Sequence, residues 1–260
     1  LAVGLVVLNH AGVPWLSGGY IGVDVFFVIS GFLITQLLID EAGENSSIDL
    51  RNFWARRARR ILPMSILVTL VTVVAGLFML EPGKVRDLSA VGLGALGFCT
   101  NIVLFFRTSD YLSGVTAPSS LRHFWSLAVE EQFYIVWPIL LLLIVQLFRT
   151  HSKKVLLAVV SVIGITSFSS IFMIEQTLTY FATQTRIWEL CLGAILAIIG
   201  TRNSPRPLQW IAVAVLLLSL LLINSSNQIP GLIILPVLLA TDLLLNVSDP
   251  KISFLLSNRV

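Results

Sequence analysis

Charged residues are scarce in this sequence. Asp, Glu, Lys and Arg together make up 12% of the 260 residues, whereas soluble globular domains carry about 25%. Hydrophobic residues make up 56%, and the mean hydropathy is +0.91. Because so little polar surface cannot cover a water-soluble globule, the sequence predicts an integral membrane protein.

Cysteine and histidine are also rare, which limits the kinds of site that the chain can build. The two cysteines, Cys99 and Cys191, lie in apolar segments without a CxxC partner, so neither a disulfide framework nor a zinc site is expected. The three histidines lack HExxH spacing, which argues against a metal centre. The basic residues lie in short connections between apolar runs, as membrane orientation alone requires, and no nucleic-acid partner is predicted.

Long apolar runs are abundant. A helix needs about 20 apolar residues to cross a bilayer, and strands would leave unpaired edges in lipid. We therefore expect an all-α, polytopic integral membrane helical bundle of about eight to nine crossings. Residues 1–260 contain no repeat or low-complexity tract and are interpreted as one domain, and the apolar opening at Leu1 predicts a fragment of a longer protein. The candidate segments are 1–13, 20–39, 61–80, 88–106, 124–148, 155–174, 186–200, 208–223 and 230–247.

The basic connections conflict with the simplest topology. Connections 40–60, 149–154 and 201–207 carry Lys and Arg and therefore favour the cytoplasmic side, yet the last two would lie outside if every segment crossed. The conflict disappears if one segment between 60 and 149 does not cross. Segment 88–106 contains three glycines and Asn101, which suit a re-entrant segment buried in protein. We hypothesise that 84–106 enters the membrane and returns to the outside.

Five arginines lie within residues 51–60. They could serve only as a positive-inside anchor. Alternatively they form a phosphate site, because guanidinium groups bind phosphate oxygens through two parallel hydrogen bonds. A cytoplasmic polyphosphate such as coenzyme A would suit the four that lie closest together, Arg56, Arg57, Arg59 and Arg60.

Residues 121–138 place polar side chains within an apolar run. A carboxylate inside a membrane costs roughly 2.5–3.5 kcal/mol on insertion scales, so two adjacent glutamates need a reason. They are either ionic partners of arginines on neighbouring helices or part of a catalytic or substrate-orienting stripe. Helical spacing predicts that one face carries His123, Ser126, Glu130, Tyr134 and Trp137, with Glu131 about 100° away.

Other polar residues also have two interpretations. His10 lies near the outer end of the first segment, where it could simply meet water, but imidazole exchanges protons near neutral pH and could act on a sugar hydroxyl. Asp24 could be only a first-turn acid favoured by the helix dipole, and Ser30 with Gly31 could only permit close packing. Arg186 and Glu189 are three residues apart and could pair within one helix.

Four runs of sequence together resemble the membrane acyltransferase-3 family. They are Gly19–Ile34, Arg56–Pro63, Phe124–Pro138 and Thr185–Gly193, and the pair GVDVFFVISGFLI and FWSLAVEEQFY is highly specific. The resemblance covers nearly the whole chain and is closest to the longer members that O-acetylate peptidoglycan or lipopolysaccharide O-antigen. It implies a multi-pass protein of the bacterial inner membrane that moves an acyl group, expected to be acetyl, from cytoplasmic acyl-CoA to a hydroxyl of an exported glycan, with no bound cofactor.

The resemblance also implies roles for single residues. His10 matches the essential first-helix histidine, and Glu130 matches the carboxylate of the FWSL motif, so both are expected to be catalytic. Arg57 and Arg60, with Arg56, match the RRxxR element, and Arg59 joins them in the predicted acyl-CoA site. The supporting set is Asp24, Ser30, His123, Trp125, Ser126, Glu131, Tyr134, Arg186 and Glu189.

Two features of the family fall outside the chain. Its basic residue eleven positions before the histidine would precede Leu1, and a further helix and an SGNH hydrolase-like domain, fused or separate, would follow Val260. Two other functions stay open at this point. A proton-coupled secondary transporter of an envelope precursor could use His10 and Glu130 as a relay, and a scaffold for envelope assembly would keep its role without His10. A requirement for acetyl-CoA separates the enzyme from the transporter, and the His10→Ala variant separates it from the scaffold.

Overall fold

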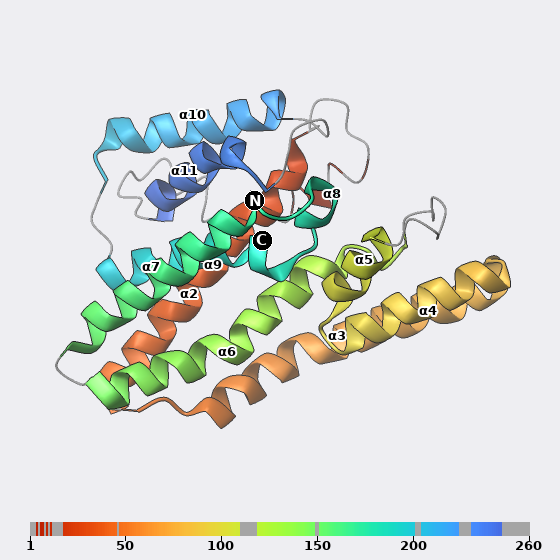
Figure 1. The fold of residues 1–260 in the computed structure, drawn as a ribbon, viewed down its shortest axis with the longest axis horizontal. Helices are drawn as coiled ribbons and strands as arrows, with labels where there is room; N and C mark the ends of the chain where they lie inside the picture. The colour runs from red at the N-terminus through yellow and green to blue at the C-terminus, as the bar shows by residue number, and fades with distance from the viewer. Residues whose placement is uncertain are drawn as a thin grey trace.

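The structure is a computed structural model that describes residues 4, 6, 7, 9, 11, 18–45, 47–109, 119–148, 151–200, 204–223 and 230–245. Every regular element in this part of the chain is a helix (Figure 1), which confirms the all-α prediction. His10 lies outside the described residues. The elements are η1 (Gly19–Ile21), α2 (Gly22–Asn45), α3 (Leu50–Met79), α4 (Pro82–Leu96), α5 (Thr100–Ser109), α6 (Phe124–Phe148), α7 (Ser152–Ser170), α8 (Gln176–Thr179), η3 (Thr183–Thr185), α9 (Ile187–Ile199), α10 (Arg206–Leu222), η4 (Leu232–Ile234) and α11 (Leu235–Leu245).

Four helices are long and apolar enough to cross a membrane: η1 with α2, then α3, α6 and α7. Three further helices, α9, α10 and α11, are apolar but shorter. The surface fits lipid, since Leu67, Leu70 and Val71 of α3 are each more than half exposed, and an apolar face of this kind is unfavourable in water. The chain is therefore a membrane protein, whereas the total of eight to nine crossings stays a prediction.

The prediction of a non-helical connection over residues 40–60 is wrong, because most of these residues are helical. Helix α2 continues to Asn45 and α3 begins at Leu50, so the arginines lie on the first turns of a helix. Asp49 caps that helix, because its Oδ1 accepts a hydrogen bond from the Asn52 N–H at 2.9 Å. Apolarity marks only the lipid-facing part of a helix, and arginine is itself a good helix former, so hydropathy missed the first turns.

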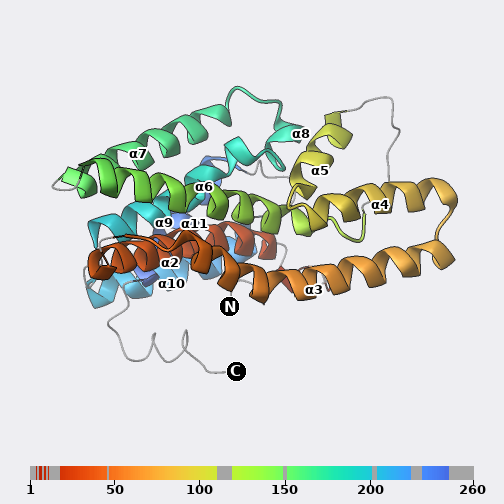
Figure 2. The same cartoon turned by 90° about the horizontal axis from the view of Figure 1, so that it is seen from below.

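Segment 88–106 is two helices rather than one. Helix α4 ends at Leu96 and α5 begins at Thr100, and between them Phe98 has a φ of 52°, which is uncommon for a residue with a side chain. Arg107 Nη2 donates to Asp87 Oδ1 at 2.9 Å and ties the two helices together. Helix α4 runs back beside α3, and α5 then turns away from it (Figure 2).

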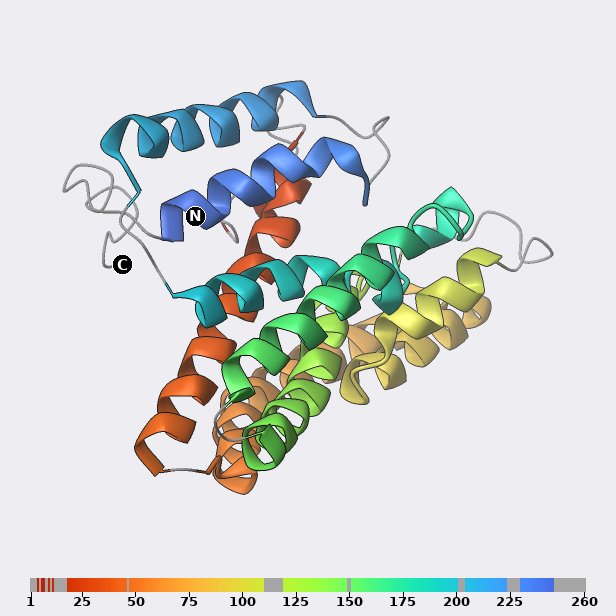
Figure 3. The ribbon, with the colours of Figure 1, turned by 60° about the vertical axis from the view of Figure 1, so that its left-hand side comes forward.

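Helices α2 and α9 form the closest pair in the bundle. A Cβ added at Gly31 would lie 2.0 Å from the Leu190 carbonyl oxygen, and one at Gly193 would lie 1.9 Å from the Val28 carbonyl oxygen. Glycine at both positions therefore lets the two backbones touch, as small residues do between membrane helices. These two helices lie between the α10–α11 pair and the remaining helices (Figure 3).

Basic residues gather toward one end of the bundle. The end of α2, the beginning of α3, the end of α6 and the beginning of α7 all lie toward this end (Figures 1 and 2). It carries the α3 arginines together with Lys153 and Lys154 of α7. Neither α4 nor α5 reaches it, and α6 starts nearer the opposite end (Figure 2).

Candidate functional site

Glu130 is the centre of a buried polar site between α2 and α6. Its side chain is 4% exposed, and its Oε1 accepts a hydrogen bond from the Ser30 hydroxyl at 2.5 Å. The Tyr134 hydroxyl, one helical turn further along α6, donates to the same oxygen. Two O–H donors therefore hold this carboxylate in the protein interior, and Oε2 accepts no hydrogen bond from the described residues.

This geometry corrects part of the sequence analysis. Ser30 does more than permit close packing, since it bonds Glu130. The predicted common face holds for Glu130, Tyr134 and Trp137, which are 4% or less exposed. His123 lies in the turn before α6 and is exposed, and Ser126 is half-buried and donates to the His123 carbonyl. The face prediction fails for His123 because the helix begins only at Phe124, whereas Ser126 lies within α6.

The arginine cluster reaches this site through one member. The Arg57 guanidinium lies over the Tyr134 ring, 4.1 Å from its centroid, at a distance typical of a cation–π contact. Arg57 is half-buried and makes no hydrogen bond to a described residue, so its N–H groups stay available to a ligand. The other arginines diverge: Arg56 lies 3.9 Å from Glu41 Oε2, Arg59 Nε donates to the Ala55 carbonyl at 3.1 Å, and Arg60 is exposed.

Glu131 is the second carboxylate of the pair. It is 8% exposed, and its Oε1 has no hydrogen-bond partner among the described residues. The two glutamates make no ion pair with the described arginines, but the charge of Arg57 on the neighbouring α3 acts on both carboxylates. The ionic role considered from sequence therefore holds only as an attraction across a longer distance. Burying polar atoms without partners is costly, which favours a role for Glu131 other than packing.

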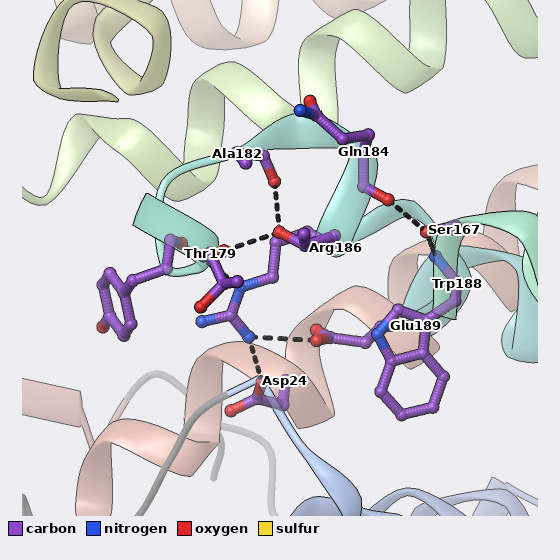
Figure 4. Close-up of polar contacts among 10 residues, drawn as sticks. Asp24, Ser167, Thr179, Ala182, Gln184, Arg186, Trp188 and Glu189 are labelled. Atoms are coloured by element: carbon purple, nitrogen blue, oxygen red, sulfur yellow. Dashed lines mark hydrogen bonds and ion pairs between the residues drawn. The ribbon is translucent and has the colours of Figure 1, made fainter. Parts of the chain in front are cut away.

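A second buried cluster joins α2 to the start of α9 (Figure 4). Arg186 Nη1 donates to Asp24 Oδ1 at 2.7 Å and to Glu189 Oε1 at 3.0 Å, and all three residues are no more than 1% exposed. The pairing of Arg186 with Glu189 inside one helical turn confirms the spacing argument. Asp24 is more than a dipole-favoured acid, because it forms a buried ion pair with a second helix.

Aromatic rings enclose the Arg186 guanidinium. Its Cζ lies 5.2 Å from the Trp125 ring centroid and 5.0 Å from that of Tyr180, and Nε donates to the Tyr180 carbonyl at 3.3 Å. Burial raises the pKa of the Tyr180 phenol, which keeps it neutral beside these charges. Trp125 therefore supports the Arg186 cluster, one to two turns before Glu130 on α6.

Three further polar residues form a closed ring that sequence reasoning missed. Gln132 Nε2 donates to Asn101 Oδ1 at 2.9 Å, Asn101 Nδ2 donates to Thr183 Oγ1 at 2.7 Å, and Thr183 Oγ1 donates to Gln132 Oε1 at 2.7 Å. We call these three residues the polar ring. Gln132 also bonds the Phe98 carbonyl at 2.9 Å, so the ring holds the α4–α5 break against α6. Asn101 was already expected from sequence to be buried in protein, and it is 1% exposed. The sequence signal for Gln132 was a glutamine beside two glutamates in an apolar run.

Chemically, the arrangement offers a hydrogen-bonded carboxylate next to a guanidinium whose donors are free. A carboxylate can accept a proton or orient a neighbouring base, and a stacked guanidinium suits a phosphate group. Fold and site together define a helical membrane protein with a buried acid connected to a basic end. No group that would hold a resident cofactor stands out among the residues described.

Comparison with known proteins identifies the family. The profile of the acyltransferase-3 family, described as "Acyltransferase domain", matches residues 1–228, and the chain belongs to this family. The resemblance drawn from the four sequence runs is thereby confirmed. No solved structure is significantly similar to the chain.

Three curated relatives of the chain are named as O-acetyltransferases. The chain is 34% identical over 214 residues to "Peptidoglycan O-acetyltransferase OatA" of Listeria monocytogenes, covering 80% of this chain and 34% of that protein. It is 35% identical over 203 residues to "Putative peptidoglycan O-acetyltransferase YrhL" of Bacillus subtilis (76% and 32%), and 36% identical over 196 residues to "O-acetyltransferase OatA" of Staphylococcus aureus (75% and 32%). The chain spans about a third of the length of these relatives.

Proposed function

We propose that this chain is the membrane part of an O-acetyltransferase that takes an acetyl group from cytoplasmic acetyl-CoA and transfers it to a hydroxyl of an exported glycan. Family membership and the relatives' names support the reaction class and a peptidoglycan acceptor. The observation that carries the proposal is structural: Arg57, Tyr134, Glu130 and Ser30 form one contiguous chain from the basic end into the buried interior. An enzyme with a cytoplasmic polyphosphate donor needs such a connection.

The donor site is proposed at the first turns of α3. Arg57 presents unpaired N–H donors on a guanidinium held by stacking, and Arg59 and Arg60 are exposed on the same turns. Positive-inside orientation places this end of the bundle in the cytoplasm, where acyl-CoA is available. Arg56, with Glu41 nearby, has the weakest claim to a phosphate contact.

The same orientation bears on the topology. If residues 50–60 face the cytoplasm of a bacterial inner membrane, the end of α6 and the beginning of α7 face it too. Helix α4 has 15 residues, about 22 Å at 1.5 Å per residue, which is short of the roughly 30 Å hydrocarbon core. We propose that α4 and α5 form a re-entrant hairpin, so that α6 begins at the outer face.

In the proposed reaction, the acceptor hydroxyl gives its proton to His10 as general base, and its oxygen attacks the thioester carbonyl. The C–S bond breaks, and coenzyme A leaves as a thiolate that takes up a proton. If His10 itself first receives the acetyl group, the same bond breaks and the acceptor oxygen then attacks acetylimidazole. Glu130, fixed by Ser30 and Tyr134, orients the imidazole or stabilises its cation.

The decisive experiment is transfer of radiolabelled acetyl from acetyl-CoA to envelope glycan by the full-length protein in membrane vesicles. His10→Ala and Glu130→Gln should abolish transfer while the protein still inserts and folds. Arg57→Ala should weaken acetyl-CoA use, whereas Lys154→Ala, which removes a cation from the same end of the bundle, should not. Full transfer by His10→Ala or Glu130→Gln would overturn the catalytic roles.

The transporter alternative receives no support from the named relatives, which are acetyltransferases. A transporter would show coupled uptake without acetyl-CoA, and a scaffold would keep its role in the His10→Ala variant. The SGNH-type partner domain, fused or separate, stays a prediction from the family resemblance, as does acetylation of lipopolysaccharide rather than peptidoglycan.

A further inference from the structure

A proline in α6 opens a gap in that helix's hydrogen bonding. Pro138 has no N–H, so the carbonyl oxygen four residues earlier, that of Tyr134, loses its helical partner. The indole N–H of Trp54 fills the gap, donating to the Tyr134 carbonyl oxygen at 3.0 Å. Trp54 belongs to α3 and precedes Arg57 by three residues. A side chain from the arginine-bearing helix therefore occupies a backbone site that Pro138 leaves without its helical donor.

Tyr134 joins the two helices at two points, because its carbonyl accepts from Trp54 and its ring lies under the Arg57 guanidinium. Its hydroxyl donates to Glu130 within α6. Tyr134 is 2% exposed, and Phe53, next to Trp54, is also 2% exposed. Neither Tyr134 on α6 nor the turn of α3 that carries Phe53 and Trp54 can move without disturbing the residues packed against it. Tyr134 of α6 thus contributes directly to the placement of the first turns of α3 relative to Glu130.

We infer that Trp54 and Tyr134 are positioning residues that dock α3 onto α6 and so set Arg57 at a fixed distance from Glu130. This inference rests on the proposed function, in which Arg57 binds the phosphates of acyl-CoA and Glu130 serves the reacting groups. An acyl-CoA bound through its phosphates places its thioester correctly only if the phosphate-binding residue, Arg57, has a fixed position relative to the reacting groups. A displacement of about 1 Å can lower the rate up to about a hundredfold.

A purely structural role for Trp54 can be separated from positioning. Trp54→Phe keeps an aromatic ring but removes the N–H, which leaves the Tyr134 carbonyl unpaired. Pro138→Ala supplies an N–H that can bond that carbonyl within α6. The double variant therefore restores a partner for the carbonyl without restoring the bond between the two helices.

The measurements are Tm and steady-state acetyl transfer from acetyl-CoA by the full-length protein in proteoliposomes. Trp54→Phe should lower Tm and raise the KM for acetyl-CoA about tenfold with a smaller change in kcat. Adding Pro138→Ala should recover Tm but not KM. Tyr134→Phe, which keeps the ring under Arg57 and loses the hydroxyl, should lower kcat and leave KM within about twofold. Trp210→Phe, at an exposed tryptophan of α10, is the matched control.

Two results would overturn the positioning role. One is an unchanged KM in Trp54→Phe, and the other is recovery of KM together with Tm in the double variant, because Trp54 would then only satisfy a carbonyl. A wild-type protein that neither binds coenzyme A nor uses acetyl-CoA would instead overturn the proposed function, and the positioning role with it. A smaller gain in Tm from Pro138→Ala in the wild-type background than in the Trp54→Phe background would still show that Trp54 fills the gap left by the proline.

Discussion

Replacing Gly193 by alanine should separate α9 from α2 and disturb the Arg186 cluster at the same interface. The new Cβ would lie 1.9 Å from the Val28 carbonyl oxygen and 2.6 Å from the Phe32 nitrogen, whereas ordinary contact begins at 3.4 Å. Both obstacles are backbone atoms of a helix, so no side-chain rotation can relieve the clash. Helix α9 must therefore move away from α2 by about 1.5 Å, which is the difference between the 3.4 Å contact limit and the 1.9 Å from the new Cβ to the Val28 carbonyl oxygen.

The cost has two parts. Overpacking a tight contact costs about 1–3 kcal/mol. A retreat of that size, if carried to the first turn of α9, also lengthens the 2.7 Å contact between Arg186 Nη1 and Asp24 Oδ1 beyond hydrogen-bond range, and breaking a buried ion pair costs about 3–5 kcal/mol. Because the arginine side chain can partly follow, we expect a total loss of about 2–4 kcal/mol.

Thermal unfolding of the purified protein in detergent measures this loss, and Tm should fall by at least about 5 °C. Gly43→Ala is the control, since Gly43 lies in α2, the partner helix of α9, and its Cβ would meet nothing within 4 Å. This variant should stabilise the helix by about 0.5–1 kcal/mol. Gly31→Ala should resemble Gly193→Ala, and the double variant should lose less than the sum, because one retreat relieves both clashes. A Gly193→Ala protein that melts with the wild type would refute the reasoning.

Three other predictions follow from the buried polar groups and the hairpin. Arg186→Leu leaves the buried carboxylates of Asp24 and Glu189 without their cation and should lower the free energy of unfolding by about 3–5 kcal/mol. Glu189→Gln should lower it by less than half as much, and equal losses in Tm would contradict the charge argument. Gln132→Leu opens the polar ring and should lower the free energy of unfolding by about 1–3 kcal/mol, and an unchanged chemical denaturation curve would count against the ring. In membrane vesicles, Lys84→Cys and Thr108→Cys should both react with an impermeant maleimide from the outer side, and labelling of Thr108→Cys only from the cytoplasmic side would exclude the re-entrant hairpin.

Much of the fold was accessible from sequence because membranes restrict the choices. Apolar runs predicted helices, and the bounds expected for 124–148 match α6. The predicted segment 61–80 missed the beginning of α3, because the arginine-rich turns are helical without being apolar. Glycine content suggested that 84–106 re-enters the membrane but did not locate the break between α4 and α5. The residue with the unusual backbone conformation there is Phe98, which no composition argument would choose.

Residue types and spacing by themselves determined that this protein is membrane-embedded and helical, and they identified Glu130, Arg57 and Arg186 as residues of interest. The resemblance of four sequence runs to the acyltransferase-3 family was confirmed by the family comparison. Only the tertiary structure decided which residues meet: that Ser30 and Tyr134 share one oxygen of Glu130, that Arg57 alone of its cluster faces inward, and that Trp54 fills the gap left by Pro138. Helical periodicity describes neighbours within one helix, whereas each of these arrangements includes a contact between α6 and α2 or α3. Such contacts depend on how the helices pack, and a periodicity cannot contain that information.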